Sequence, residues 1–74
     1  ILCNPPFHQQ SVMGDAVAWR MFSGARKVLR SGGAMLVVGN RHLAYHSKLR
    51  RIFGNCDVVD SDPRFVVLRS YVRQ

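Results

Sequence analysis

The stretch AMLVVG, residues 34–39, constrains the fold of this chain more than any other segment. It is a continuous apolar run bounded by glycines, which is typical of a strand buried on both of its faces. Segments with helical and with strand-like patterning alternate on either side of it. We therefore predict an α/β fold with a mainly parallel sheet.

Two segments have the periodicity of amphipathic helices. The first is expected to start near Gly14 or Asp15 and to run to about Arg30, before a Gly32-Gly33 stop. The second is expected over residues 43–53, before Gly54 and Asn55. The predicted apolar stripes are Val17, Met21, Ala25, Val28 and Leu29 in the first helix, and Tyr45, Leu49, Ile52 and Phe53 in the second. We expect Trp19 to pack between the two helices.

The remaining segments are predicted strands and connections. Residues 1–3 are the end of a strand, and residues 4–13 form a loop. Two further strands, 56–60 and 65–72, are joined by a turn over residues 61–64 and are expected to pair antiparallel. The predicted order is β–α–β–α–β–β, a mostly parallel sheet finished by an antiparallel strand, with helices covering its faces.

The chain has 74 residues and starts directly with an apolar segment, without Met. A single core of this size is marginal, and a buried strand usually has neighbours on both sides. We therefore expect residues 1–74 to be the C-terminal half of a larger domain. The edge of strand 1–3 would then be exposed, which predicts self-association through that edge.

The charge balance favours an anionic partner. Eleven Lys and Arg, nine of them Arg, stand against four acidic residues, all Asp, for a formal net charge of +7. Arg presents a planar fork that suits phosphate and stacks on bases, so nucleic acid is the first partner class to consider. The alternative is that acids elsewhere in a larger protein balance this charge.

Thiol, metal and membrane chemistry find little support in the sequence. Cys3 and Cys56 lack metal-binding or redox spacing, which predicts buried, reduced thiols in a cytoplasmic protein. His42 and His46 lie four residues apart, but without a third ligand no metal site is predicted. The sequence contains no run of about 18 apolar residues that would span a membrane.

Two polar segments follow predicted parallel strands. Asn4-Pro5-Pro6-Phe7 comes after the first, and Asn40-Arg41-His42 comes after the second. In open α/β sheets, ligands bind beyond the carboxyl ends of the strands. We therefore expect both segments to lie at one edge and to form a site, although a strand-to-loop NPPF is, on composition alone, more often an ordinary turn than a site.

The first of these segments has the chemistry to hold an amino group. Each proline fixes its own φ, lacks an N–H and pushes the preceding residue toward extended geometry. The backbone carbonyls of such a segment can point outward, and Asn4 adds a side-chain carbonyl. Two acceptor oxygens can hold both hydrogens of an exocyclic amine. Phe7 offers an aromatic face on which a base would stack, which is worth roughly 1–3 kcal/mol.

These residues resemble a known family. NPPF after an apolar strand is the motif of S-adenosylmethionine-dependent N-methyltransferases of the Rossmann-like class. The stretches NPPFHQQ and VVGNRHLAYHSKLRRIFGNCDVV are similar to the bacterial ribosomal RNA guanine-N2 methyltransferases, and most like the large-subunit (23S) enzyme. The resemblance covers essentially the whole chain. It implies the C-terminal half of a Rossmann-like methyltransferase fold and an enzyme acting on ribosomal RNA in the cytoplasm.

The resemblance also implies roles for individual residues. Asn4 and the Pro5 carbonyl would hold the target amine, Pro6 would stiffen the loop and Phe7 would stack on the guanine. Asn4 would also border the methyl donor, S-adenosylmethionine. The implied RNA contacts are Phe7, His8, Gln9, Arg41 and His42, with Gln10 on the same side.

One departure from the family pattern and several alternatives stay open. The family's glycine-rich cofactor loop and its ribose-binding acid are not found in these 74 residues, so the chain alone is expected to be inactive. The nearest alternative is the small-subunit (16S) guanine-N2 enzyme. A non-catalytic basic RNA-binding α/β module is a second alternative. Methylation of a protein glutamine or of an adenine ranks lower, because those relatives more often carry Tyr in place of Phe7.

Overall fold

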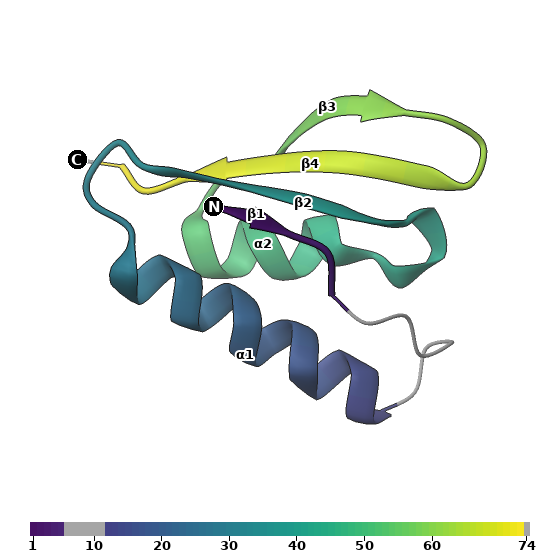
Figure 1. The fold of residues 1–74 in the computed structure, drawn as a ribbon, viewed down its shortest axis with the longest axis horizontal. Helices are drawn as coiled ribbons and strands as arrows, with labels where there is room; N and C mark the ends of the chain where they lie inside the picture. The colour runs from purple at the N-terminus through teal and green to yellow at the C-terminus, as the bar shows by residue number, and fades with distance from the viewer. Residues whose placement is uncertain (6–11, 74) are drawn as a thin grey trace.

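A computed structural model describes residues 1–5 and 12–73 as a four-stranded sheet with two α-helices (Figure 1). The elements are β1 (Leu2–Cys3), α1 (Val12–Val28), β2 (Ala34–Asn40), a 3-10 turn η1 (Arg41–Leu43), α2 (Tyr45–Phe53), β3 (Asp57–Ser61) and β4 (Phe65–Tyr71). The predicted order of helices and strands is confirmed. None of the helices in the described residues is long and apolar enough to cross a membrane.

The strand order in the sheet is β1-β2-β4-β3. β1 and β2 are parallel, and β4 runs antiparallel to both β2 and β3. The predicted β3–β4 hairpin is therefore confirmed. β4 lies between β2 and β3 instead of extending an outer edge, so the three strands that share one direction are not all adjacent.

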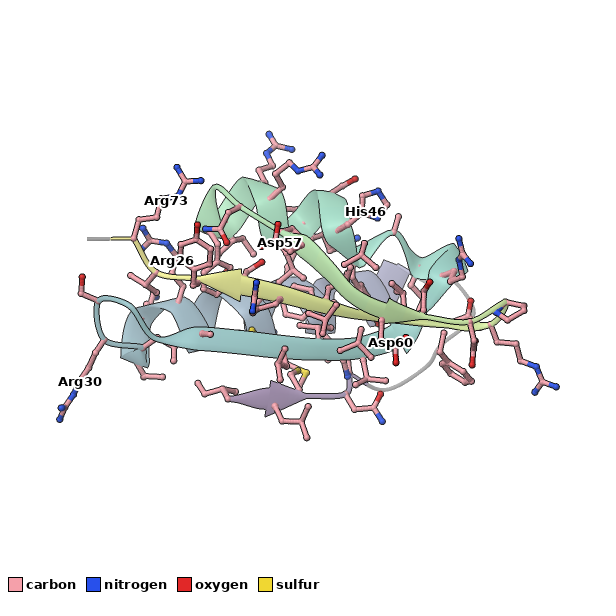
Figure 2. All side chains as sticks on the ribbon, turned by 90° about the horizontal axis from the view of Figure 1, so that it is seen from above. Arg26, Arg30, His46, Asp57, Asp60 and Arg73 are labelled. Atoms are coloured by element: carbon pink, nitrogen blue, oxygen red, sulfur yellow. The ribbon has the colours of Figure 1, made fainter. Side chains whose placement is uncertain are left out.

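Both helices cover the same face of the sheet, so the expectation that helices cover its faces is wrong for the described residues. Figure 1 shows α1 and α2 on one side, and in Figure 2 they lie behind the sheet. The cause is the handedness of the crossovers. The chain moves from β1 to β2 and on to β3 in the same direction across the sheet, and two right-handed crossovers in one direction place both helices on one side.

The buried stripe of α1 differs from the predicted one. Ala18, Phe22 and Ala25 are buried and Leu29 is partly buried, whereas Met21 and Val28 are 37% and 73% exposed. Both stripes have helical spacing, and the structure buries the one that carries the Phe22 ring. That ring meets Tyr45 of α2 edge-on, with centroids 5.4 Å apart and planes at 87°.

Other element boundaries shift by one or a few residues. α1 begins at Val12 and ends at Val28, earlier at both ends than expected, and Gly32 adopts the left-handed conformation with φ 83°. The helical segment expected over 43–53 divides into η1 and α2, with Ala44 between them at φ 55°. As expected, Tyr45, Leu49 and Phe53 of α2 are buried and Gly54 caps its end.

The core lies between the sheet and the helices. The residues buried there with the largest side chains are Phe22, Met35, Leu49, Leu68 and Val37. Trp19 is half-buried, and the Lys48 ammonium of α2 lies 6.0 Å from its ring centroid, so Trp19 lies at the junction of the two helices as expected. On the opposite face of the sheet, Leu2 and Phe65 are exposed.

Candidate functional site

The carboxyl ends of β1 and β2 lie at one edge of the sheet, as predicted. Asn4 follows β1 directly and is exposed, whereas Pro5 is buried. Burial of the proline ring fixes the point at which the chain leaves the sheet, and its fixed φ limits the directions that the backbone can take there. The Asn4 side chain makes no hydrogen bond within residues 1–5 and 12–73. An exposed amide on an anchored backbone is accessible to a ligand.

The register places Asn4 close to the second polar segment. Cys3 is paired with Val37, so Asn4 is level with Val38, two residues before Asn40 on the adjacent strand. Ideal strands are about 4.8 Å apart with a rise of about 3.3 Å per residue, and this geometry, continued by one residue past β1, would put the Cα atoms of Asn4 and Asn40 about 8 Å apart. Side chains alternate along a strand, so Asn40, at the end of β2, belongs to the face away from the helices, and Asn4 follows the buried Cys3 and is exposed. The structure thus brings together the two polar segments that the sequence predicted to form a site.

Arg41 has a role that the sequence did not predict. Its backbone N–H donates to the Arg64 carbonyl at 3.0 Å, and its Nη1 donates to the Asp62 carbonyl at 3.1 Å. Arg41 therefore ties the end of β2 to the β3–β4 turn. Its side chain stays exposed, and the other guanidinium N–H groups remain as donors, so an RNA contact by Arg41 stays a prediction.

The β3–β4 turn is held by Asp62. The Asp62 carboxylate accepts the backbone N–H groups of Arg64 and Phe65, both at 2.7 Å. These hydrogen bonds, first the one from Phe65 and then the one from Arg64, lower the pKa of Asp62, and the positive charge of Arg41 adds to the effect. The carboxylate is thus ionised but already engaged by the turn.

This turn brings two residues to the site edge that sequence reasoning missed. Phe65 is paired with Asn40 and is 47% exposed, and Arg64 precedes it. An exposed aromatic ring beside an exposed guanidinium is a combination that suits a nucleobase and its phosphate. The sequence identified a turn at 61–64, but only the placement of β4 beside β2 shows that this turn lies at the site edge.

Several predicted site residues lie outside the part of the chain that the structure describes. These are Pro6, Phe7, His8, Gln9 and Gln10, together with the side chain of His42, whose backbone belongs to η1. Their roles stay predictions. Within the described residues, no group of three or more His, Cys, Asp or Glu is arranged to hold a metal ion.

The two cysteines lack the character of nucleophiles. Burial raises the pKa of the Cys3 thiol, and burial is also the main cause of the raised pKa of Cys56. Both are free thiols. A thiol with a raised pKa is mostly protonated near neutral pH and reacts slowly. The described part of the edge therefore offers hydrogen-bond acceptors and positive charge, and the Asp62 carboxylate there is committed to a turn.

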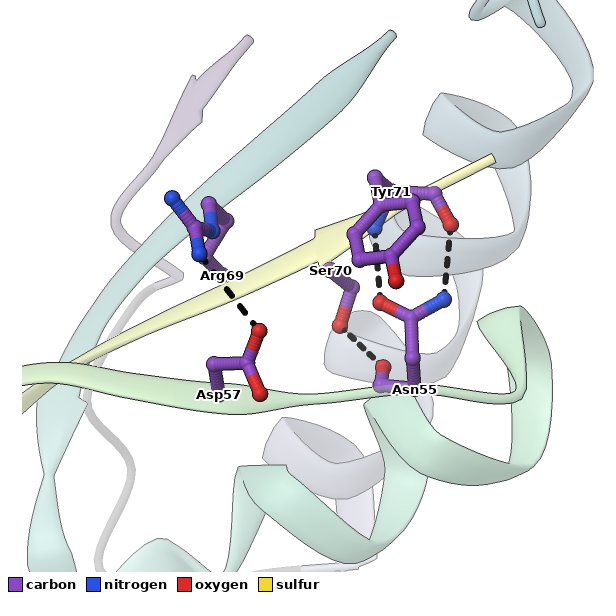
Figure 3. Close-up of polar contacts among 5 residues, drawn as sticks. All are labelled: Asn55, Asp57, Arg69, Ser70 and Tyr71. Atoms are coloured by element: carbon purple, nitrogen blue, oxygen red, sulfur yellow. Dashed lines mark hydrogen bonds and ion pairs between the residues drawn. The ribbon is translucent and has the colours of Figure 1, made fainter. Parts of the chain in front are cut away.

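Asn55, at the opposite end of the sheet, shows what a structural asparagine looks like in this fold (Figure 3). Its Nδ2 donates to the Tyr71 carbonyl at 2.8 Å and to the Phe53 carbonyl at 3.3 Å, and its Oδ1 accepts the Tyr71 N–H at 3.0 Å. The Ser70 hydroxyl donates to its backbone carbonyl at 2.7 Å. The Asn55 amide thus stands in for a strand partner of β4. β3 starts at Asp57, one residue later than expected.

The described residues form an open α/β sheet with β4 antiparallel between β2 and β3, both helices on one face, and two polar segments at the carboxyl edge. In open α/β sheets this edge is where ligands bind. The family is shown by sequence. The sequence model of the family described as 'Methyltransferase small domain' matches residues 1–69, so the chain belongs to this family.

Individual relatives agree with this assignment. The chain is 61% identical over 70 residues to the ribosomal RNA large subunit methyltransferase G of Stutzerimonas stutzeri (strain A1501) and 56% identical over 70 residues to that of Yersinia pestis (strain Pestoides F). These matches cover 95% of this chain but only 19% and 18% of those relatives.

The fold also has a solved counterpart. The T. thermophilus 16S rRNA N2 G1207 methyltransferase, solved in complex with AdoMet and guanosine, matches 97% of this chain with a TM-score of 0.77 and 28% identity. The match covers 19% of that chain. The predicted relation to a Rossmann-like methyltransferase fold is therefore confirmed.

Proposed function

We propose that this chain carries the acceptor side of the active site of an S-adenosylmethionine-dependent enzyme that methylates the exocyclic N2 amine of a guanine in 23S ribosomal RNA. The observation that carries the proposal is the exposed amide of Asn4, anchored by the buried Pro5 at the carboxyl edge of the sheet. Support for the RNA substrate comes from the names of the relatives that are 61% and 56% identical.

The proposed roles follow from hydrogen-bond chemistry. The Asn4 side-chain carbonyl and the Pro5 backbone carbonyl each accept one hydrogen of the N2 amine, which directs the nitrogen lone pair toward the methyl donor. Phe7 stacks on the guanine ring, and Pro6 stiffens the segment between them. His8, Gln9, Arg41 and His42 contact the surrounding RNA.

The proton balance needs no base from the described residues. The nitrogen forms a bond to the methyl carbon as the sulfur–methyl bond breaks, and the electron pair of that bond stays on sulfur. The amine is then cationic and releases one proton to water. Catalysis by this chain would therefore rest on positioning, which can contribute several kcal/mol.

Among the described residues, we propose one point of contact with the methyl donor. S-adenosylmethionine supplies an electrophilic methyl group on a sulfonium, and Asn4 is the described residue that would border it. The Asp62 carboxylate, in the turn that Arg41 ties to the end of β2, already accepts two backbone N–H groups, so it is a poor ligand for ribose hydroxyls. We accordingly propose that residues 1–74 are the C-terminal half of a methyltransferase domain whose other half holds most of the cofactor, and that the chain alone is inactive.

Two alternatives make different predictions. A 16S substrate is favoured by the likeness to the T. thermophilus 16S rRNA enzyme, but that chain is 28% identical, against 61% for the large-subunit relative. A non-catalytic RNA-binding module is favoured by the net charge of +7. It would bind RNA without transferring a methyl group.

The test uses the full-length protein that carries this sequence. Unmodified 23S and 16S transcripts are incubated with S-adenosylmethionine labelled in its methyl group, and the RNA is digested to nucleosides. We expect labelled N2-methylguanosine from the 23S transcript. Label in the 16S transcript alone would favour the small-subunit alternative, and RNA binding without label would favour the non-catalytic module.

A further inference from the structure

Six exposed cations gather at the end of the molecule opposite to Asn4, where α1, α2 and β4 end. We call this group the basic end; its members are Arg26, Lys27, Arg30, Arg50, Arg51 and Arg73. Figure 2 shows Arg26, Arg30 and Arg73 at the same end of the molecule, where β4 ends and the C-terminus lies. The group comes from three elements that are distant in sequence.

Hydrogen bonds hold these three elements together. The Gly32 N–H donates to the Val72 carbonyl at 2.7 Å, and the Val72 N–H donates to the Gly33 carbonyl at 2.9 Å, which joins the turn after α1 to the end of β4. The Asn55 amide joins the end of α2 to Tyr71. The positions of the cations are therefore set by buried or backbone contacts, and not by contacts among the cations themselves.

The acids in the described residues do not neutralise the basic end. Asp57 pairs with Arg69 at 3.5 Å, the Asp60 carboxylate accepts the Ser61 N–H, and the Asp62 carboxylate is bound by its turn. Within the described side chains no ion pair joins a residue of the basic end to a carboxylate. Like charges at this density repel one another, so the group gains stability when a polyanion approaches.

Helix dipoles explain part of this arrangement but not all of it. Arg26 and Lys27 lie in the last turn of α1, and Arg50 and Arg51 lie in the last turn of α2, where cations stabilise the negative helix end. Arg73 follows β4 and belongs to neither helix. A dipole account therefore gives no reason for Arg73 to lie beside the other five.

We propose that the basic end binds the phosphate backbone of the substrate RNA as a second contact, separate from the site at Asn4; this rests on the proposed function for the identity of the RNA. β2 spans the distance between the two ends, and six residue steps of about 3.3 Å give about 20 Å. A single nucleoside bound at Asn4 cannot reach so far. The basic end therefore selects an extended RNA over a small guanine compound, and it does so without reading sequence.

The test measures RNA binding by the full-length protein as a function of salt. The variants are Arg50→Gln with Arg51→Gln, and Arg73→Gln; the control is Arg20→Gln, an exposed helical arginine of α1 outside the basic end. The probe is a single-stranded RNA longer than the 34 Å axis of the described chain. Each lost phosphate contact is expected to lower the slope of log K against log salt by about 0.7.

The double variant should thus lower the slope by about 1.4 and weaken binding about twenty-fivefold at about 0.1 M salt, and Arg73→Gln should lower it by about 0.7 with roughly fivefold weaker binding. Arg20→Gln and the binding of a trinucleotide should change little. A slope equal to that of the unsubstituted protein in Arg73→Gln, which leaves both helices intact, would overturn the proposal. So would equally tight binding of polyglutamate with the same dependence on these arginines, which would assign the surface to acidic proteins.

These outcomes are separable from the proposed function. A protein that binds RNA with the expected salt dependence but transfers no methyl group would refute the proposed reaction and leave the basic end intact. A protein that methylates guanine, but whose salt slope does not change when these arginines are substituted, would refute the role of the basic end and leave the proposed reaction intact. Far-UV circular dichroism of each variant confirms that the helices persist.

Discussion

Asn4 and Asn55 are the same side chain at opposite ends of one sheet, and their surroundings differ in almost every respect. Asn4 is exposed and makes no hydrogen bond within the described residues. Asn55 is 9% exposed and makes three side-chain hydrogen bonds. A buried, fully bonded amide stabilises the fold, whereas an exposed amide on an anchored backbone is available to a ligand. Both residues belong to stretches on which the family resemblance rests. The resemblance therefore includes residues that stabilise the fold as well as residues with a proposed role in the reaction.

The largest effect is expected from Asn4→Ala. If the Asn4 carbonyl positions the amine, its removal should lower kcat for methyl transfer by about a hundredfold to a thousandfold, as the loss of one oriented hydrogen-bonding group does in other enzymes. The midpoint of urea unfolding should not move, because Asn4 is exposed. Methyl transfer and unfolding are measured on the same preparation, and retained activity would remove Asn4 from the mechanism.

Asn55→Ala should show the converse. Truncation leaves the partly buried N–H and carbonyl of Tyr71 without their partner, and it should lower the free energy of unfolding by about 2–3 kcal/mol. Methyl transfer per folded molecule should remain, because Asn55 lies at the other end of the sheet. Urea unfolding gives the free energy, with Ser47→Ala, at an exposed position of α2, as the matched control. A loss of activity in Asn55→Ala without a loss of stability would contradict the division of roles.

The substitution Gly39→Ala tests side-chain packing near the site edge, and not hydrogen bonding. A Cβ at Gly39 would lie 2.7 Å from two atoms of the Tyr45 ring, which packs in turn against Phe22. The ring must shift, and we expect a loss of about 1–3 kcal/mol in unfolding free energy. In a Tyr45→Leu background the same substitution should cost less. A double-mutant cycle measures this coupling, and strict additivity would show that the ring is not the obstacle.

The same contrast explains which parts of the molecule could be predicted. The order of elements followed from the glycine-bounded run at 34–39 and from helical periodicity, because both signals are local. The place of β4 beside β2 depends on pairing between distant segments, so the sequence did not reveal that Phe65 lies at the site edge. The stripe of α1 was misread because two sets of residues had the same spacing, and tertiary packing chose the one with Phe22.

Residues at the site edge divide in a similar way. Asn4 could be predicted as a site residue because the proline that follows restricts its backbone and a strand precedes it. The bond from Arg41 to Asp62 could not, since it joins segments 21 positions apart in the sequence. The pairing of the Asn55 amide with Tyr71 also escaped prediction, because no local pattern marks a side chain that replaces a strand partner.

The smallest effect concerns the acid dependence of the β3–β4 turn. The folded pKa of Asp62 is lowered, whereas an unfolded Asp titrates near about 3.9, so the carboxylate stabilises the folded turn fully above that pH and loses this contribution as the pH falls through the folded pKa. We expect Asp62→Asn, which keeps an oxygen acceptor for the Arg64 and Phe65 N–H groups but has no charge, to remove that pH dependence while leaving the turn formed. The amide chemical shifts of these two residues, followed by NMR from about pH 6 to about pH 2, report the turn directly. Identical acid titrations in both proteins would mean that the Asp62 charge does not hold the turn, and that the tie between Arg41 and the Asp62 carbonyl is enough to keep it at the site edge.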